Sequence, residues 1–254
     1  MTKIVISSYN KDMTSTNYIT SQEVNARQER ADRILDAAAE LYQRHGYKRV
    51  TIDDIAERAD IGKGTIYLHW KTRQALSNAV IERELLFGID EFLSAIQQDP
   101  TTALPHRIAS LAYRIVMGRP MLHALYTSNW GVLGKLIKSG WGGELVKNIN
   151  KASNKYMLIL MECNLIRPGI SITDLSFIYR TIMGGFFLTD SFLSETYSFT
   201  LEHKAELLAE AVQRTLEVET SPAPETIQLL ASRAIEMLTK SRTEVFASLS
   251  QAYE

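Results

Sequence analysis

The chain has 254 residues, 45% of them hydrophobic and 22% charged, so it is long enough for one large or two smaller globular domains. Its net charge of −1 excludes a polycation, and any surface for nucleic acid must therefore be local. The single cysteine, Cys163, excludes an internal disulfide and a cysteine-based zinc cage. No apolar run approaches the roughly 20 residues that span a bilayer, so we expect a cytoplasmic protein with no membrane segment.

The N-terminal part predicts a tail followed by a helix. Residues 1–26 are rich in Ser, Thr and Asn and show no helical period, which predicts a mobile tail. From Arg27 onward, apolar residues recur at helical spacing as far as Tyr42. Gly46 is placed to end this helix, because glycine accepts the left-handed conformation of a helix stop.

Two short helices are predicted next. Thr51 can cap a helix of about two turns, and Asp53 and Asp54 suit the positive end of its dipole. A tight turn follows at residues 60–61, and a third short helix is predicted over 63–70.

The rest of the chain predicts a larger helical body. Apolar periodicity indicates helices at about 73–97, 101–117, 120–128, 144–165, 172–194, 201–218 and 224–250. No alternating run bounded by turns occurs, so strands are not expected and the fold class is all-α. The predicted domains are a three-helix unit over 27–72 and a body over 73–254 with an extra C-terminal helix.

The stretch "GKGT" at residues 62–65 suggests a phosphate-binding loop at first sight. A Walker A loop requires G-x-x-x-x-G-K-[ST] after a strand. Here Gly64 follows Lys63, Glu57 stands where the first glycine is needed, and an amphipathic helix precedes the stretch. Nucleotide hydrolysis is therefore a weak alternative.

A helix-turn-helix explains the same stretch better. Ile66 and Trp70 are four residues apart, so they share one helix face and can pack inward. The outward surface then carries polar side chains suited to DNA phosphates and base edges. The candidate DNA-binding residues are Thr51, Lys63, Gly64, Thr65, Tyr67, His69 and Lys71.

The run "TIDDIAERADIGKGTIYLHWKTRQAL", with the preceding "ILDAAAELYQRHGYKRV", strongly resembles the N-terminal domain of the TetR family of bacterial transcriptional regulators over about residues 28–76. The residues that match the family pattern are Tyr42, Gly46, Tyr47, Thr51, Ile52, Ile55, Ala56, Ala59, Lys63, Gly64, Thr65, Ile66, Tyr67, His69 and Trp70. Asp60 stands where a glycine is usual, and Gly62 stands where Ser or Thr commonly caps the recognition helix.

The resemblance implies a repressor that binds double-stranded operator DNA as a homodimer and is released by a small-molecule effector. It also implies that the body dimerises and senses that effector. In "DLSFIYRTIMGGFFLTDSFL" one apolar stripe is the candidate dimer interface, with an internal core helix of a monomer as the alternative. The stripe comprises Leu175, Ile178, Ile182, Gly185 and Phe186.

Methionine and aromatic residues of the body are the candidate ligand pocket, since such side chains adapt to apolar ligands. Ordinary core packing is the alternative for each of them. The candidates are Met117, Leu122, Tyr126, Trp130, Trp141, Tyr156, Met157, Met183 and Phe187.

Catalysis finds little support. The five histidines lack metal-ligand spacing, and no nucleophile motif such as G-x-S-x-G occurs, so we expect no cofactor, no metal and no enzyme activity. A helical protein-interaction module that has lost DNA binding is the remaining rival, supported only by Asp60 and Gly62.

Overall fold

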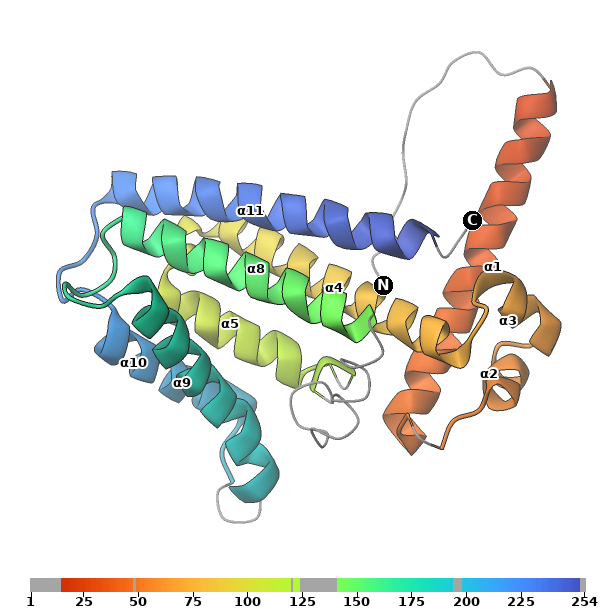
Figure 1. Cartoon of the computed structure of the whole chain (residues 1–254), viewed down its shortest axis with the longest axis horizontal. Coiled ribbons are helices and arrows are strands. Elements are labelled where there is room, and N and C mark those ends of the chain that lie inside the picture. The colour runs from red at the N-terminus through yellow and green to blue at the C-terminus, as the bar shows by residue number, and fades with distance from the viewer. Residues whose placement is uncertain (1–14, 48, 120, 124–140, 194–197, 252–254) are drawn as a thin grey trace. The chain divides into compact units, whose positions relative to one another are not determined.

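The computed structural model describes residues 15–47, 49–119, 121–123, 141–193 and 198–251 (Figure 1). Over these residues the chain is helical apart from its turns and one isolated bridge, which confirms the all-α prediction. The chain divides into an N-terminal unit, residues 1–73 with 252–254, and a body, residues 74–251. The boundary predicted between residues 72 and 73 lies one residue before this division.

The N-terminal unit consists of α1 (Ser15–His45), α2 (Ile52–Arg58) and α3 (Lys63–His69), and α2 packs against both of its neighbours. Helix α1 begins twelve residues before the expected start at Arg27, so the predicted tail is helical from Ser15 onward. The segment includes good helix formers such as Glu23 and Ala26, which support a helix without an apolar stripe.

The turn between α2 and α3 has a defined geometry. The Asp60 N–H donates to the Glu57 carbonyl at 3.1 Å, and the Ile61 N–H donates to the Ala56 carbonyl at 3.0 Å. These two bonds form a Schellman motif, which needs a left-handed residue just past the helix. Asp60 takes that place with φ 53°, a conformation for which aspartate is tolerated and glycine is preferred.

The helices of the body lie close to the predicted ranges. They are α4 (Arg73–Gln98, whose first residue belongs to the N-terminal unit), η1 (Pro100–Ala103), α5 (Pro105–Met117), α8 (Trp141–Glu162), α9 (Ile172–Leu193), α10 (Leu201–Leu216) and α11 (Pro224–Gln251). The predicted helix 101–117 is interrupted, because Pro105 starts α5 at a position where its missing N–H costs nothing. Of the predicted helix 120–128, residues 121–123 are helical and the others lie outside the described residues.

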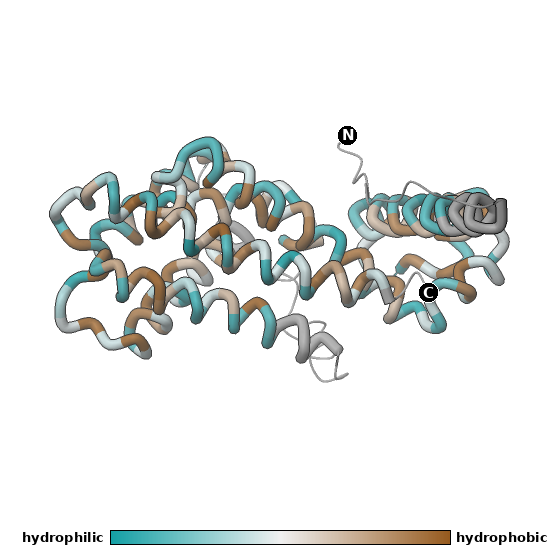
Figure 2. The backbone as a smooth tube through the Cα atoms, turned by 90° about the horizontal axis from the view of Figure 1, so that it is seen from above, coloured by the Kyte–Doolittle hydropathy of each residue, from teal (hydrophilic) through white to brown (hydrophobic). Residues whose placement is uncertain are grey.

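Apolar side chains of these helices form one buried core in the body, and the tube in Figure 2 shows apolar and polar residues alternating along the helices. Tyr113 of α5 stacks on Phe187 of α9 with ring centroids 5.5 Å apart. The extra C-terminal helix α11 packs against η1 and α8. Its Arg242 also pairs with Asp90 of α4 at 2.6 Å.

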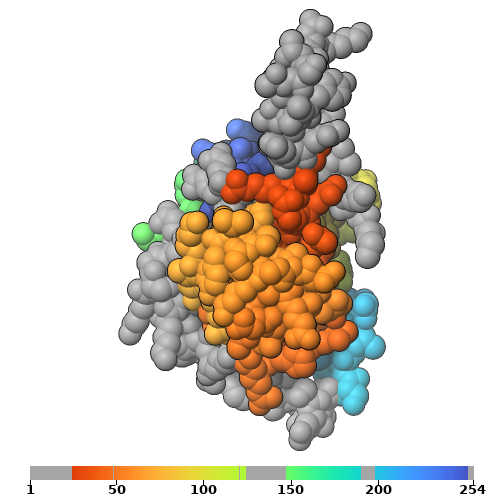
Figure 3. Space-filling view, turned by 90° about the vertical axis from the view of Figure 1, so that its right-hand side faces the viewer, coloured from red at the N-terminus to blue at the C-terminus, as the bar shows by residue number. Residues whose placement is uncertain are grey.

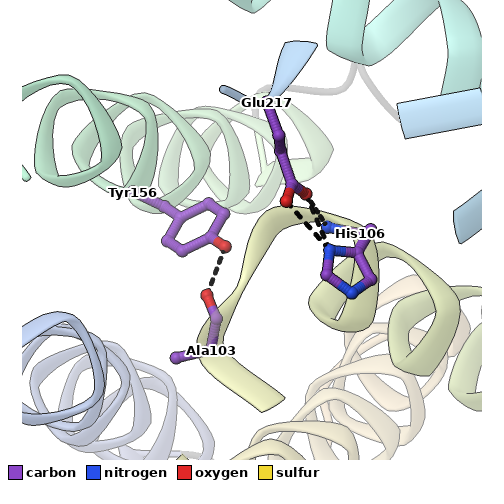
Figure 4. Close-up of polar contacts among 4 residues, drawn as sticks. All are labelled: Ala103, His106, Tyr156 and Glu217. Atoms are coloured by element: carbon purple, nitrogen blue, oxygen red, sulfur yellow. Dashed lines mark hydrogen bonds and ion pairs between the residues drawn. The ribbon is translucent and has the colours of Figure 1, made fainter. Parts of the chain in front are cut away.

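A short bridge joins the end of α10 to the loop after α8. The Arg167 N–H donates to the Leu216 carbonyl at 2.9 Å, and the Val218 N–H donates to the Leu165 carbonyl at 3.2 Å. Glu217, between them, accepts the His106 N–H at 2.7 Å and contacts its ring at 2.9 Å, so it caps the first turn of α5 (Figure 4). The Glu217 carboxylate thus ties the end of α10 to the start of α5, and the two backbone hydrogen bonds tie α10 to the loop after α8.

No helix among the described residues is both long enough and apolar enough to cross a membrane.

Glu82 of α4 is buried, with 4% of its surface exposed, and accepts a hydrogen bond from the Ser248 hydroxyl of α11 at 2.5 Å. Burial raises the pKa of Glu82 to about 7, because the charged form loses its hydration. A carboxyl whose pKa is raised by folding stabilises the protonated native state. Its contribution is complete below pH 4.5 and is lost as the pH rises through 7.

We therefore expect Glu82→Gln to be more stable than wild type above pH 7. Its free energy of unfolding relative to wild type should rise by about 2–3 kcal/mol between pH 4.5 and pH 8. Urea unfolding of both chains at pH 4.5, 6 and 8 measures this difference. Glu236→Gln, at an exposed glutamate of α11, is the matched control and should leave the pH dependence unchanged. Parallel pH profiles for wild type and Glu82→Gln would contradict the assignment.

Candidate nucleic-acid interface

Helix α3 presents two different faces. Ile66 is fully buried and Trp70, just past the helix, is 2% exposed, so both pack inward as their spacing predicts. On the other side Lys63 and Gly64 are exposed, and Tyr67 is 39% exposed. In Figure 3 the residues of α2 and α3, drawn in orange, form one continuous surface.

Lys63 does not stand alone on this surface. Its Nζ lies 2.8 Å from Oδ2 of Asp53 on α2, and half of the Lys63 side chain remains exposed. The hydrogen bond to Asp53 raises the pKa of Lys63, so the ammonium stays charged. A phosphate that approaches Lys63 must compete with the Asp53 carboxylate, which lies on the same exposed surface.

Thr51 begins α2 within a capping box. Its N–H donates to Oδ2 of Asp54 at 2.7 Å, and its hydroxyl oxygen accepts the Asp54 N–H at 3.2 Å. Hydrogen bonds from Thr51, first its N–H and then its hydroxyl, lower the pKa of Asp54. The Thr51 N–H is therefore already bonded to Asp54 and is not free for a phosphate.

The remaining candidates lie around the start and the end of α3. Gly62 is the N-cap and makes no side-chain capping bond, as the missing hydroxyl implies. A Cβ at Gly64 would meet nothing within 4 Å, so this part of the helix surface is open. Thr65 is half-buried, and Lys71 is exposed just beyond the helix.

His69 lies elsewhere than expected. Only 8% of it is exposed, and its ring lies 5.3 Å from that of Trp70. It shares the inward face with Ile66, three residues earlier, rather than an outward row with Thr65. Burial, followed by the charges of Arg27 and Arg30, lowers the pKa of His69. The prediction of an exposed, DNA-facing His69 is therefore wrong.

Leu68 is the residue that the sequence reasoning did not assign. It is 68% exposed on α3, between Tyr67 and the buried His69. Its position two residues after Ile66, about 200° around the helix, is the signal that could have placed it outward.

The structure also excludes a Walker A loop at "GKGT". These residues form the N-cap and first turn of α3, and the preceding element is α2 rather than a strand.

A model of the bacterial regulatory proteins of the tetR family matches residues 34–80. The match starts in α1, includes all of α2 and α3, and ends in α4. The N-terminal domain of this chain belongs to the tetR family.

Curated relatives resemble only part of this chain. The transcriptional activator FasR of Mycolicibacterium smegmatis is 32% identical over 81 residues, which cover 32% of this chain and 35% of FasR. The transcriptional repressor KstR of Rhodococcus jostii is 40% identical over 60 residues, which cover 24% of this chain and 28% of KstR. The matches thus span about a third of these relatives' lengths.

Solved structures extend the likeness to the helical body. SmeT in its complex with triclosan has a TM-score of 0.59 at 16% identity, over 77% of this chain and 96% of SmeT. SmeT is the repressor of the Stenotrophomonas maltophilia efflux pump SmeDEF. At this identity the likeness shows the fold alone, a helix-turn-helix unit followed by a helical body, as predicted.

The pocket candidates of the helical body are mostly core residues. Leu122, Tyr156, Met157 and Phe187 are buried, while Met117 and Met183 are half-buried against the same core. The Tyr156 hydroxyl donates to the Ala103 carbonyl at 2.7 Å (Figure 4), and burial raises its pKa well above the usual value. Tyr126 and Trp130 lie outside the described residues, as does the side chain of Trp141, the first residue of α8.

The dimer candidates lie on α9 at different depths. Leu175 is fully buried, Ile178, Ile182 and Phe186 pack against the body's core, and Gly185 is exposed. The exposed stripe of α9 runs instead through Phe177, Thr181 and Gly185 at intervals of four residues. Phe177 is 71% exposed, which makes it the most exposed of the large apolar side chains that the structure describes.

Proposed function

We propose that the protein is a TetR-type transcriptional regulator that binds a palindromic operator as a homodimer. The observation that carries the proposal is the division of α3 into a buried face, Ile66 and Trp70, and an exposed face with Lys63 and Tyr67. A helix of this kind enters the major groove with its polar side outward, and Lys71 follows it to reach the backbone. The remaining candidates in the proposed contact surface are Thr51, Gly64 and Thr65.

A repressor is the proposed sign of regulation. KstR and SmeT are both named as repressors, although FasR is named as an activator. A repressor occupies its operator without effector, and binding of a small apolar or amphipathic molecule in the body shifts the population toward a dimer that no longer fits two major grooves. The triclosan complex of the similarly folded SmeT supports an effector of this chemistry.

The two recognition helices of a dimer must lie about 34 Å apart to reach successive major grooves. A stable dimer also needs an apolar contact surface, and the exposed stripe of Phe177, Thr181 and Gly185 on α9 fits this need. Thr181 and Gly185 are small enough for a second copy of the helix to approach closely.

Removal of Lys63 and Tyr67 tests DNA binding. Duplexes enriched from a random pool by the wild-type chain serve as the probe, and fluorescence anisotropy measures affinity. The double variant Lys63→Ala and Tyr67→Ala should lose roughly ten- to hundredfold in affinity, and Lys63→Ala alone should lower the slope of log affinity against log salt by about 1. Lys240→Ala, at an exposed lysine of α11, is the control. Unchanged affinity in the double variant would refute the proposed interface.

Phe177→Glu tests the dimer. A buried, unpaired carboxylate at a two-fold contact is repeated in both chains, so the variant should sediment with the mass of one chain where wild type has twice that mass. Leu229→Glu, at the 53% exposed Leu229 of α11, is matched in chemistry and should remain dimeric. If the Phe177→Glu variant remains a dimer, the proposal that α9 forms the interface is contradicted.

A set of apolar compounds, triclosan among them, tests the effector. At least one of them should weaken binding of the enriched duplex by about fivefold or more at saturation, as coupling energies of 1–3 kcal/mol imply. The duplex affinity is measured with and without each compound, and the dimer mass is checked in parallel. If no compound changes the affinity for the duplex, the proposal of an apolar effector is contradicted, while the proposal of a DNA-binding regulator stands.

A further inference from the structure

Two neighbouring apolar side chains are exposed on α3. Of the large hydrophobic side chains described in the N-terminal unit, those that are exposed are Tyr67, at 39%, and Leu68, at 68%. Ile52, Ile55 and Ile66 of this unit are buried, and its Leu41, Tyr47 and Ile61 are half-buried. The unit therefore confines its large exposed apolar surface to the helix that is proposed to read DNA.

Leu68 has no role in the core. Ile66, His69 and Trp70 occupy the inward side of the helix and its end, and Leu68 projects away from them. Single exposed leucines are common on protein surfaces and need no explanation by themselves. Here, however, the leucine follows Tyr67 directly, and two exposed lysines lie at the start of the same helix and just beyond its end, Lys63 and Lys71.

These neighbours indicate the chemistry of the partner. The two lysines favour a polyanion, and the leucine requires an apolar group within that polyanion. The floor of the DNA major groove offers such a group, since thymine carries a C5 methyl beside its O4 acceptor. A G·C pair presents there an N4–H donor and the N7 and O6 acceptors, which a leucine would cover without pairing.

We propose that Leu68 is a specificity-determining residue that packs against thymine C5 methyl groups in the operator. This inference rests on the proposed function, because it requires α3 to enter the major groove. Lys63 and Lys71 then contribute phosphate contacts that do not depend on sequence, while Leu68 selects an A·T pair at one position of each half-site.

Replacement of thymine by uracil isolates the methyl group. Duplexes are first enriched from a random pool by the wild-type chain. Each conserved dT of a half-site is then replaced, one position at a time, by dU, which keeps the base pair and removes one methyl group. Wild type should lose about fourfold in affinity at one position, the value expected for one buried methyl group.

Leu68→Ala should lose a similar factor on the dT duplex and nothing further on the dU duplex, so the two changes are coupled in a double-mutant cycle. Leu229→Ala makes the same change at an exposed leucine of α11 and should keep the full dT preference. Because Leu68 is exposed, the variant should retain the helical circular dichroism and unfolding midpoint of wild type.

Two failures are distinguishable. If no duplex is enriched above non-specific binding, both the proposed function and this inference are overturned. If duplexes are enriched but every dT-to-dU change is neutral, or if Leu68→Ala keeps the full methyl preference, only the role of Leu68 is overturned. Enrichment of duplexes with only G·C pairs in each half-site would overturn it as well.

Discussion

Burial of Ile66 and Trp70 is the constraint on which the N-terminal unit depends. Helix α3 has only seven residues, too few to be stable alone, so it persists because one side is packed. That packing also decides what the solvent side displays. Because Ile66 and Trp70 point into the core, the side chains on the opposite side of the helix, Lys63, Tyr67 and Leu68, point into solvent. The same contacts that hold the helix therefore orient its proposed reading face.

The proposed DNA-reading face of α3 contains a lysine that is already paired with a carboxylate. Asp53 on α2 pairs with Lys63 on α3, and both side chains stay largely in solvent, where such a pair adds little stability. Its consequence lies in binding rather than folding. In the proposed DNA complex, a phosphate at Lys63 would displace a carboxylate that already pairs with the ammonium, which would reduce sequence-independent attraction to DNA. Contacts that depend on base identity would then contribute a larger share of the proposed affinity.

In the body, polar ties connect helices that are distant in sequence. Glu217 joins the end of α10 to the start of α5, and Arg242 and Ser248 attach α11 to α4. The Tyr156 hydroxyl is committed to a backbone carbonyl of η1. A ligand in this region would have to displace core side chains such as Met157 or break these hydrogen bonds and ion pairs.

The sequence by itself determined most of the helices and the inward side of α3, because helical periodicity is a local property. It missed the first twelve residues of α1 and the interruption before α5. It also identified the two unusual positions, and the structure shows their consequences in the left-handed φ of Asp60 and the missing cap at Gly62. Only the tertiary structure decided that His69 is buried, that Asp53 holds Lys63 and that the exposed stripe of α9 runs through Phe177. These outcomes depend on which neighbouring element faces a side chain and on where the backbone leaves the helix, and neither is encoded in the spacing of residues along one helix.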